Sequence, residues 1–290
     1  MSAQADAQSR AATAARIAGT MRTAAKGPFL GKTAIVTGAS RGIGAATALH
    51  LSDLGANVML LARSGAEIAD LAADIVDHGH EAEALTCDVG DTGSVANAVG
   101  AAMDRWGRID LVVNNAGLIE PIARIEDSDP TAWAKAIKVN VMGVYNMLRH
   151  ALPHLAAAKG TVVNVSSIAA VRALEGWSHY CASKAAVLSL TRSVHAEHPE
   201  VTAVGLSPGT VATGMQKSIR ESGLNPVSRT PWEAHIPPEW VARAIAWLWD
   251  GGAEPYQGSD FSIKHKYGRR AVGLPEDGAL DGTWEETRHG

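Results

Sequence analysis

The chain has 290 residues, of which 46% are hydrophobic and 19% are charged, and its formal net charge is −4 at pH 7. This composition is enough to bury the core of one large α/β domain, and the charge offers no basic surface for nucleic acid. No apolar run approaches the roughly 20 residues of a membrane-spanning helix, so we expect a cytoplasmic protein without nucleic-acid or membrane partners. Its two cysteines, Cys87 and Cys181, have neither CxxC nor Cys/His spacing, which predicts no disulfide framework and no metal site.

Residues 1–28 differ in composition from the rest of the chain. They are rich in Ala, Thr, Ser and Gln, and they contain four basic residues but only one acidic residue, Asp6. Their apolar residues form no helical stripe, which favours a flexible or weakly helical extension. A basic, acid-poor segment also resembles an organelle transit peptide, and an arm that packs on a partner subunit is a third interpretation.

From Gly31 onward, short β-branched apolar runs alternate with longer Ala-rich segments. This pattern is typical of repeated βαβ units and predicts a single α/β domain, residues 29–290, with a Rossmann-type doubly wound sheet of about seven parallel strands. Apolar residues spaced three and four apart, as in 45–54 and 133–155, predict helices that cover the sheet. The expected strands are Thr33–Val36, Val58–Leu61, Ala82–Thr86, Leu111–Val113, Thr161–Val165, Val201–Leu206 and Asp260–Ile263.

A glycine-rich segment, Thr-Gly-Ala-Ser-Arg-Gly-Ile-Gly at 37–44, follows the first strand and opens the first helix. Such a turn lets backbone N–H groups approach a pyrophosphate at the positive end of the helix. Glycine also serves any tight turn, so the position between strand and helix is what favours a nucleotide site. The cofactor-binding residues expected here are Gly38, Ser40, Arg41, Gly42, Ile43 and Gly44.

The end of the second strand indicates which cofactor this site takes. An NAD enzyme usually places an acidic residue there, against the ribose hydroxyls, whereas this chain has Arg63 and Ser64. The planar guanidinium of Arg63 matches a 2′-phosphate, and Arg41 reaches the same group from the other side. Either arginine alone would be an ordinary surface charge, but the two together favour NADP(H).

Asp88 and Val89 come just after the third strand. At this position a side chain meets the adenine of a bound dinucleotide, so we include both in the cofactor site. The alternative for Asp88 is a cap on the helix that begins near Asp91.

Tyr180 and Lys184 lie four residues apart in an Ala-rich stretch that is expected to be helical. This spacing places the phenol and the ammonium on one helix face. A nearby Lys⁺ and an oxidised nicotinamide both favour the phenolate, which would lower the tyrosine pKa and suit it to acid–base catalysis. Such pairs are common in helices, so other residues have to support the assignment.

Ser167 supplies that support, because it follows a strand at the carboxyl edge of the sheet, where open α/β folds bind ligands. Its hydroxyl is expected to hold the substrate oxygen beside Tyr180, and the neighbouring Ser166 competes for this role. Asn140 is a poor residue for a helix interior unless its side chain has a task, such as holding a water behind Lys184. The alternative is an ordinary helical asparagine.

Two later segments are expected to lie near the substrate. Residues 213–240 form an irregular stretch with four prolines and two tryptophans, which predicts a lid over the site rather than a simple surface loop. The tail, 264–290, is charged and unperiodic, and either ends the chain flexibly or lies across a neighbour or the active site. Trp177 either lines the pocket or is a buried aromatic without ligand contact.

Together these residues carry a family resemblance. The matching features are the 37–44 glycine turn, Asn-Asn-Ala-Gly at 114–117, Asn140, the set of Ser167, Tyr180 and Lys184, and Ser-Pro-Gly at 207–209 with Thr213. On these features, the region from about 30 to 263 resembles the short-chain dehydrogenase/reductase family. The family's serine precedes its tyrosine by thirteen residues, which selects Ser167 over Ser166.

The resemblance implies a specific chemistry and cofactor site. Tyr180 would exchange the proton and Ser167 would polarise the carbonyl. Lys184 would bind the nicotinamide ribose and lower the tyrosine pKa, while Asn140 would support a proton relay. The remaining cofactor-binding residues it implies are Asn115, Ala116, Gly117, Tyr180, Lys184, Pro208, Gly209, Val211 and Thr213.

Finer similarities, such as Gly-Trp at 176–177 and Met-Gln at 215–216, resemble the sepiapterin reductase and benzil reductase branch. They imply the reduction of a small-molecule ketone or vicinal dicarbonyl, and the family resemblance implies a homodimer or homotetramer. Ala212, where an acidic residue is expected, and the unusual tail depart from this branch. A nucleotide-sensing regulator is the main alternative function, and a sugar-nucleotide epimerase is disfavoured because little length remains for its second domain.

Overall fold

The computed structural model describes residues 27–276 of the chain. The expected N-terminal extension therefore lies almost wholly outside the described residues, as does the second half of the expected tail. Within 27–276, no helix combines the length and apolar character that crossing a membrane requires.

A single sheet of seven parallel strands forms the centre of the molecule, in the order β3-β2-β1-β4-β5-β6-β7. This architecture confirms the predicted doubly wound Rossmann-type fold. The order reverses between β1 and β4, which creates the crevice where such sheets bind ligands. The strands are β1 (Thr33–Thr37), β2 (Asn57–Ala62), β3 (Ala82–Thr86), β4 (Leu111–Asn114), β5 (Thr161–Val165), β6 (Thr202–Ser207) and β7 (Asp260–Ser262).

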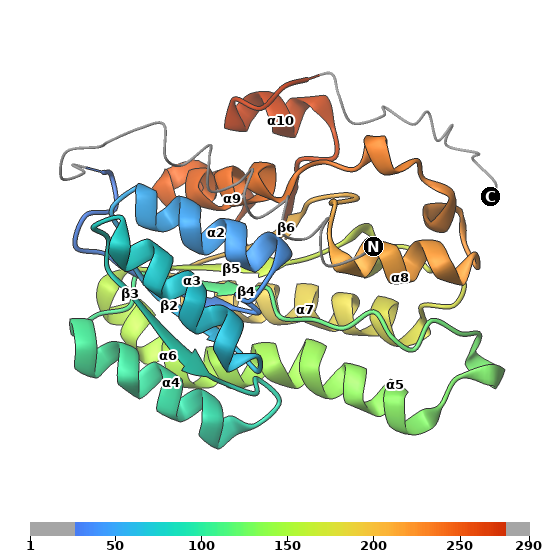
Figure 1. The fold of residues 1–290 in the computed structure, drawn as a ribbon, viewed down its shortest axis with the longest axis horizontal. Coiled ribbons are helices and arrows are strands. Elements are labelled where there is room, and N and C mark those ends of the chain that lie inside the picture. Colours follow the sequence, from blue (N-terminus) through green and yellow to red (C-terminus); the bar gives the residue numbers. More distant parts are fainter. Residues whose placement is uncertain (1–26, 277–290) are drawn as a thin grey trace.

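Helices cover both faces of the sheet (Figure 1). One apolar core joins the sheet to α2, α3 and α9, and a second joins its other face to α4, α6 and α7. All five residues of β1 are buried, as expected for a strand packed on both sides. The helices are α2 (Gly42–Asp53), α3 (Gly65–Asp77), α4 (Thr92–Trp106), α5 (Pro130–Ile137), α6 (Gly143–Ala158), α7 (Ser178–Glu197), α8 (Gly214–Ser222), α9 (Pro238–Trp247) and α10 (Lys266–Val272).

The helical region expected over 133–155 is interrupted by a feature that its apolar pattern does not reveal. Asp129 caps α5, and a π-helical turn at Lys138–Met142 separates α5 from α6. This turn contains Asn140, which is buried. A single π turn inside a helix often marks a functional position.

The described part of the C-terminal tail is ordered as α10, which contacts α9. Its Arg269 is 1% exposed, and the guanidinium donates hydrogen bonds to the carbonyl oxygens of Lys264 (3.2 Å) and Glu276 (2.7 Å). Of the two interpretations of the tail, the flexible end does not hold for 264–276, because this buried arginine holds the segment on the domain.

Two neighbouring residues of α3 test the assigned core face. Ile75 is 2% exposed, whereas Val76 is 51% exposed. Ile75→Ala should lower the free energy of unfolding by about 2–5 kcal/mol through lost burial and a cavity. Val76→Ala should change it by less than about 0.5 kcal/mol. Denaturant titration of both variants measures the contrast, and equal effects would contradict the assigned face.

Candidate active site

A cavity of about 910 Å³ opens at the carboxyl ends of the strands. Its walls come from the segments that follow β1, β2, β3, β4, β5 and β6, together with 213–236 and two residues of the C-terminal segment. Every predicted site residue lines it except Gly44 and Asn140, which lie directly behind the wall. In residues 27–276, no three His, Cys, Asp or Glu side chains are grouped as metal ligands.

The glycine turn after β1 has the backbone geometry of an anion-binding loop. Gly38 and Gly42 have φ values of +65° and +58°, which favour glycine. A Cβ on Gly38 would lie 2.9 Å from the Ala116 Cα, and a Cβ on Gly44 would collide with the Gly38 carbonyl oxygen. No side chain caps α2 at Arg41, so its first N–H groups remain available to a phosphate.

Hydrogen bonds tie this turn to the one that follows β4. The Thr37 hydroxyl accepts from the backbone N–H groups of Asn115 (3.0 Å) and Ala116 (3.1 Å) and donates to the Val113 carbonyl. The Asn115 amide donates to the carbonyl oxygens of Thr37 (3.0 Å) and Gly38 (3.2 Å). Asn115 thus holds the glycine turn in addition to lining the cavity, a role that the sequence analysis did not assign to it.

The part of the cavity that follows β1 and β2 carries two exposed arginines. Arg41 and Arg63 both line it, and neither has an ion-pair partner among residues 27–276. Asp88 also lines the cavity, and its carboxylate accepts from the Gly90 N–H at 2.9 Å. The α4 cap is Asp91, which accepts from the Ser94 N–H, so the capping alternative for Asp88 is wrong.

Tyr180 and Lys184 lie on one face of α7, as their spacing predicts, and both are more than 90% buried. The Lys184 Nζ lies 5.5 Å from the centre of the Tyr180 ring and donates to the Val165 carbonyl at 2.6 Å. Burial raises the pKa of Tyr180 to about 12 and lowers that of Lys184 to about 8. The expected lowering of the tyrosine pKa is not found in the protein alone, because the loss of solvation outweighs the nearby hydroxyl.

The structure separates the two candidate serines. The Ser167 hydroxyl lies close enough to the phenol to offset part of the rise in the Tyr180 pKa, and it accepts from the Ala169 N–H at 3.2 Å. Ser166 is buried, and its hydroxyl donates to Asp260 at 2.6 Å. Ser167 is therefore the serine that faces the phenol.

Asn140 is placed by the π turn rather than by a regular helix. Its Oδ1 accepts from the Leu118 N–H at 2.7 Å, and its Nδ2 donates to the Leu118 carbonyl (2.9 Å) and the Ser183 hydroxyl (3.2 Å). The side chain therefore fixes the segment after β4 against α7. Its assignment to a proton relay stays a prediction.

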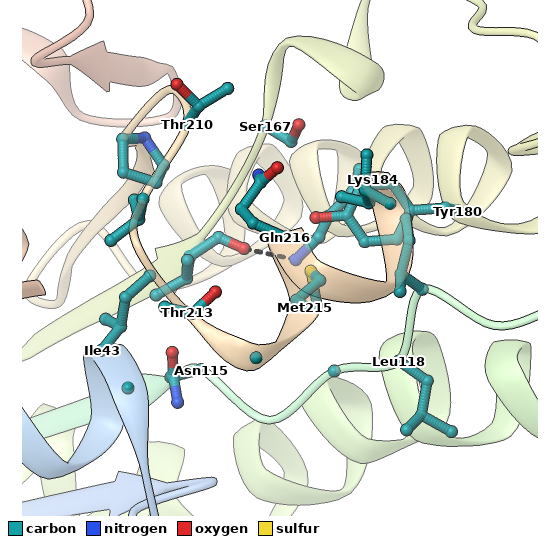
Figure 2. A pocket seen from close by; sticks show the side chains of 18 of the residues that line it. Ile43, Asn115, Leu118, Ser167, Tyr180, Lys184, Thr210, Thr213, Met215 and Gln216 are labelled. Atoms are coloured by element: carbon teal, nitrogen blue, oxygen red, sulfur yellow. Dashed lines mark hydrogen bonds between the residues drawn. The ribbon is translucent and has the colours of Figure 1, made fainter. Parts of the chain in front are cut away.

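The segment 213–236 contributes a large part of the cavity wall. A parallel bridge joins Val211 to Ile236 and closes this segment on itself. Figure 2 shows Met215 and Gln216 of α8 alongside Tyr180 and Lys184, and all four line the cavity. Trp177 also lines it and packs edge-on against Tyr180 at 5.6 Å, which favours the interpretation that it lines the pocket.

Several residues that line the cavity were not among the predicted site residues, including Gln216, Lys264 and Arg269. They belong to the 213–240 and 264–290 segments, which the sequence analysis expected near the substrate, but their irregular or charged sequence did not single out these three side chains.

Comparisons with known proteins agree with this geometry. A family model described as short chain dehydrogenase matches residues 32–223. The chain belongs to this oxidoreductase family. It is 37% identical over 247 residues to cis-4-hydroxycyclohexanecarboxylate dehydrogenase of Sinomonas cyclohexanicum, covering 82% of this chain and 97% of that protein.

Solved structures of the family extend the comparison to cofactors, which in this family are nicotinamide dinucleotides. An alcohol dehydrogenase from the archaeon Thermococcus sibiricus, complexed with 5-hydroxy-NADP, is 29% identical with a TM-score of 0.71, over 80% of this chain and 95% of that one. An NAD⁺-bound xylitol dehydrogenase is 25% identical with a TM-score of 0.75, over 81% and 98%. Relatives with this fold thus include complexes of both cofactor types.

The depressed lysine pKa has a consequence for stability. Between about pH 8 and 10.5 the unfolded chain holds a proton on Lys184 that the folded chain has released, so this group's contribution to stability rises with pH and is least favourable below pH 8. Lys184→Met should therefore raise the free energy of unfolding at pH 7 by on the order of 1–3 kcal/mol. The gain should shrink by pH 9.5 in chemical denaturation, and a gain that is independent of pH would contradict it.

Proposed function

We propose that this chain is an NADP(H)-dependent carbonyl reductase that interconverts a ketone and an alcohol. The arrangement of Tyr180, Lys184 and Ser167 at one end of a cofactor-sized cavity carries the proposal. A sensor of nucleotides on the same fold would need the glycine turn but not a buried phenol and ammonium beside a serine.

The proposed chemistry assigns one task to each side chain. Ser167 donates a hydrogen bond to the substrate carbonyl oxygen and holds it near the Tyr180 hydroxyl. As a hydride reaches the carbonyl carbon, Tyr180 gives its proton to the oxygen, and the Lys184 ammonium stabilises the phenolate. Burial keeps the phenol protonated until the reaction begins. The bound nicotinamide supplies the hydride, and alcohol oxidation follows the reverse path.

The residues of the cavity fit a dinucleotide. The uncapped start of α2 and the close approach of Gly38 to Ala116 suit a pyrophosphate, and Asn115 keeps the two turns together. Arg41 and Arg63, which lack ion-pair partners in 27–276, suit a 2′-phosphate, which favours NADP(H) over NAD(H). We assign Pro208, Gly209, Val211 and Thr213 to the nicotinamide end, because they line the cavity just after β6, the strand next to β5, which leads to Ser167.

Several finer features belong to the same proposal. The segment 213–240 is the lid, and the substrate is a ketone or dicarbonyl of the kind reduced by the sepiapterin and benzil reductase branch. The relative that acts on 4-hydroxycyclohexanecarboxylate adds cyclic ketones to the candidates. Exposed Met142 and Tyr145, near the start of α6, support a homodimer or homotetramer, and we propose a cytoplasmic location.

A substrate panel tests the function directly. NADPH and NADH oxidation should be followed against diketones, aryl ketones, cyclic ketones, pterins and sugars, with alcohol oxidation as the reverse assay. Turnover of at least one carbonyl with NADPH is expected. Tight cofactor binding without turnover of any compound would favour the nucleotide sensor.

Tyr180→Phe removes the proton donor while keeping the ring. The rate of carbonyl reduction should fall by about 10²- to 10⁴-fold, the range typical of a lost general acid. NADPH affinity, measured by fluorescence titration, should stay close to that of the wild type. A variant with the wild-type rate would refute the assignment of Tyr180.

Arg63→Ala and Arg41→Ala test the cofactor preference. Each should weaken NADPH binding by about 10- to 100-fold, since a hydrogen bond to a charged group contributes roughly 1.5–3 kcal/mol. NADH binding, which lacks the 2′-phosphate, serves as the control and should change little. An equal loss for both cofactors would mean that these arginines do not bind that phosphate.

A further inference from the structure

A partly buried carboxylate, Asp260, contacts Ser166 of the cavity wall and has no role in the chemistry described above. Asp260 begins β7 and pairs in register with Gly205 of β6. A Cβ on Gly205 would collide with the Asp260 carboxylate, so the glycine leaves the space that this side chain occupies. The carboxylate crosses over β6 and accepts a hydrogen bond from the Ser166 hydroxyl, at the end of β5, at 2.6 Å.

Asp260 and Lys184 lie on the same face of the sheet. Ala203, two residues before Gly205, packs in the apolar core that includes Val187 and Val194 of α7. Because alternate residues of a strand share a face, Gly205 and the carboxylate above it also face α7. Lys184 reaches this face from α7 and donates to the carbonyl of Val165, the residue before Ser166. One dipeptide, Val165-Ser166, thus contacts both charged groups.

The charges around this carboxylate suit an electrostatic role. Lys184 and Arg192, both on α7, favour ionised Asp260 and counteract burial, which raises its pKa. Asp260 in turn counteracts the burial that lowers the pKa of Lys184, whose other ionisable neighbour is Tyr180. The Oδ1 of Asp260 is buried without a hydrogen-bond partner in the described chain. One oxygen of the carboxylate therefore makes no hydrogen bond that would anchor the strand.

We propose that Asp260 is a positioning residue that keeps the buried ammonium of Lys184 charged beside Tyr180. Its catalytic consequence rests on the proposed function, because the ammonium must be charged to stabilise the phenolate as the proton leaves. The competing role is purely structural, in which Asp260 only anchors Ser166 and β7. That role predicts no change in the titration of Lys184 when the charge is removed.

Asp260→Asn separates these roles, because the amide oxygen still accepts from Ser166 while the charge is lost. The titration of Lys184 is followed by ¹⁵N NMR of the lysine side chains in the protein without substrate, with Lys184→Arg used to assign the signal. The midpoint of Lys184 should fall by about 1 pH unit, the effect of one lost neighbouring charge. An unchanged midpoint would overturn the proposal.

Three further variants test whether a shift in the Lys184 midpoint comes from the lost charge. Ser166→Ala removes the hydrogen bond and keeps the charge, so the Lys184 midpoint should move much less than in Asp260→Asn. Asp70→Asn makes the same chemical change at an exposed carboxylate of α3 and should have no effect. Asp260→Ser removes the charge with a smaller side chain and gives a second reading if the asparagine variant fails to fold, which thermal unfolding would reveal. A midpoint shift in Ser166→Ala equal to that of the charge-removing variants would contradict the electrostatic role.

Turnover provides the second readout. In Asp260→Asn the alkaline limb of the kcat/KM profile for carbonyl reduction should move to lower pH by the same amount, with little loss near pH 6. A wild-type protein that turns over no carbonyl would refute the proposed function while the NMR titration still decides the role of Asp260. Wild-type turnover with an unmoved limb and midpoint in Asp260→Asn would refute this inference alone.

Discussion

The hydrogen bonds of Thr37 and Asn115 are the interaction on which the candidate site depends most. They join the turns after β1 and β4 at the point where the strand order reverses. The approach is close enough that a Cβ on Gly38 would press against Ala116. Because this contact fixes where α2 begins, it sets the direction of its free N–H groups and the floor of the cavity.

Burial determines the acid–base properties of Tyr180 and Lys184 in the cavity. The phenol and the ammonium are both buried side chains of α7, and burial shifts the pKa of each in the direction that favours its neutral form. Such a pair needs other groups to restore charge when a proton moves. Ser167 acts on the phenol from the end of β5, and the carboxylate of Asp260 acts on the ammonium from the sheet. The pair is thus tuned by strands as well as by its own helix.

The sequence was sufficient for the seven strands, because buried parallel strands form short apolar runs, and each expected boundary lies within one residue of the observed one. It also identified the cavity residues that follow strands, because that edge binds ligands in this kind of sheet. It did not reveal the π turn around Asn140, whose apolar pattern is helical on both sides. It expected the segments of Gln216 and Arg269 near the site but did not identify these side chains as part of the cavity wall, because their places depend on tertiary packing.

The anchoring of Arg269 has a practical consequence for work with this chain. The guanidinium is held by carbonyl groups on both sides of α10, one at Lys264 and one at Glu276, and the same residue lines the cavity. A truncation before Glu276 would leave a buried cation with fewer acceptors. Purification tags and fusion partners therefore belong beyond this point, and libraries that vary chain length at this end also vary the wall of the cavity.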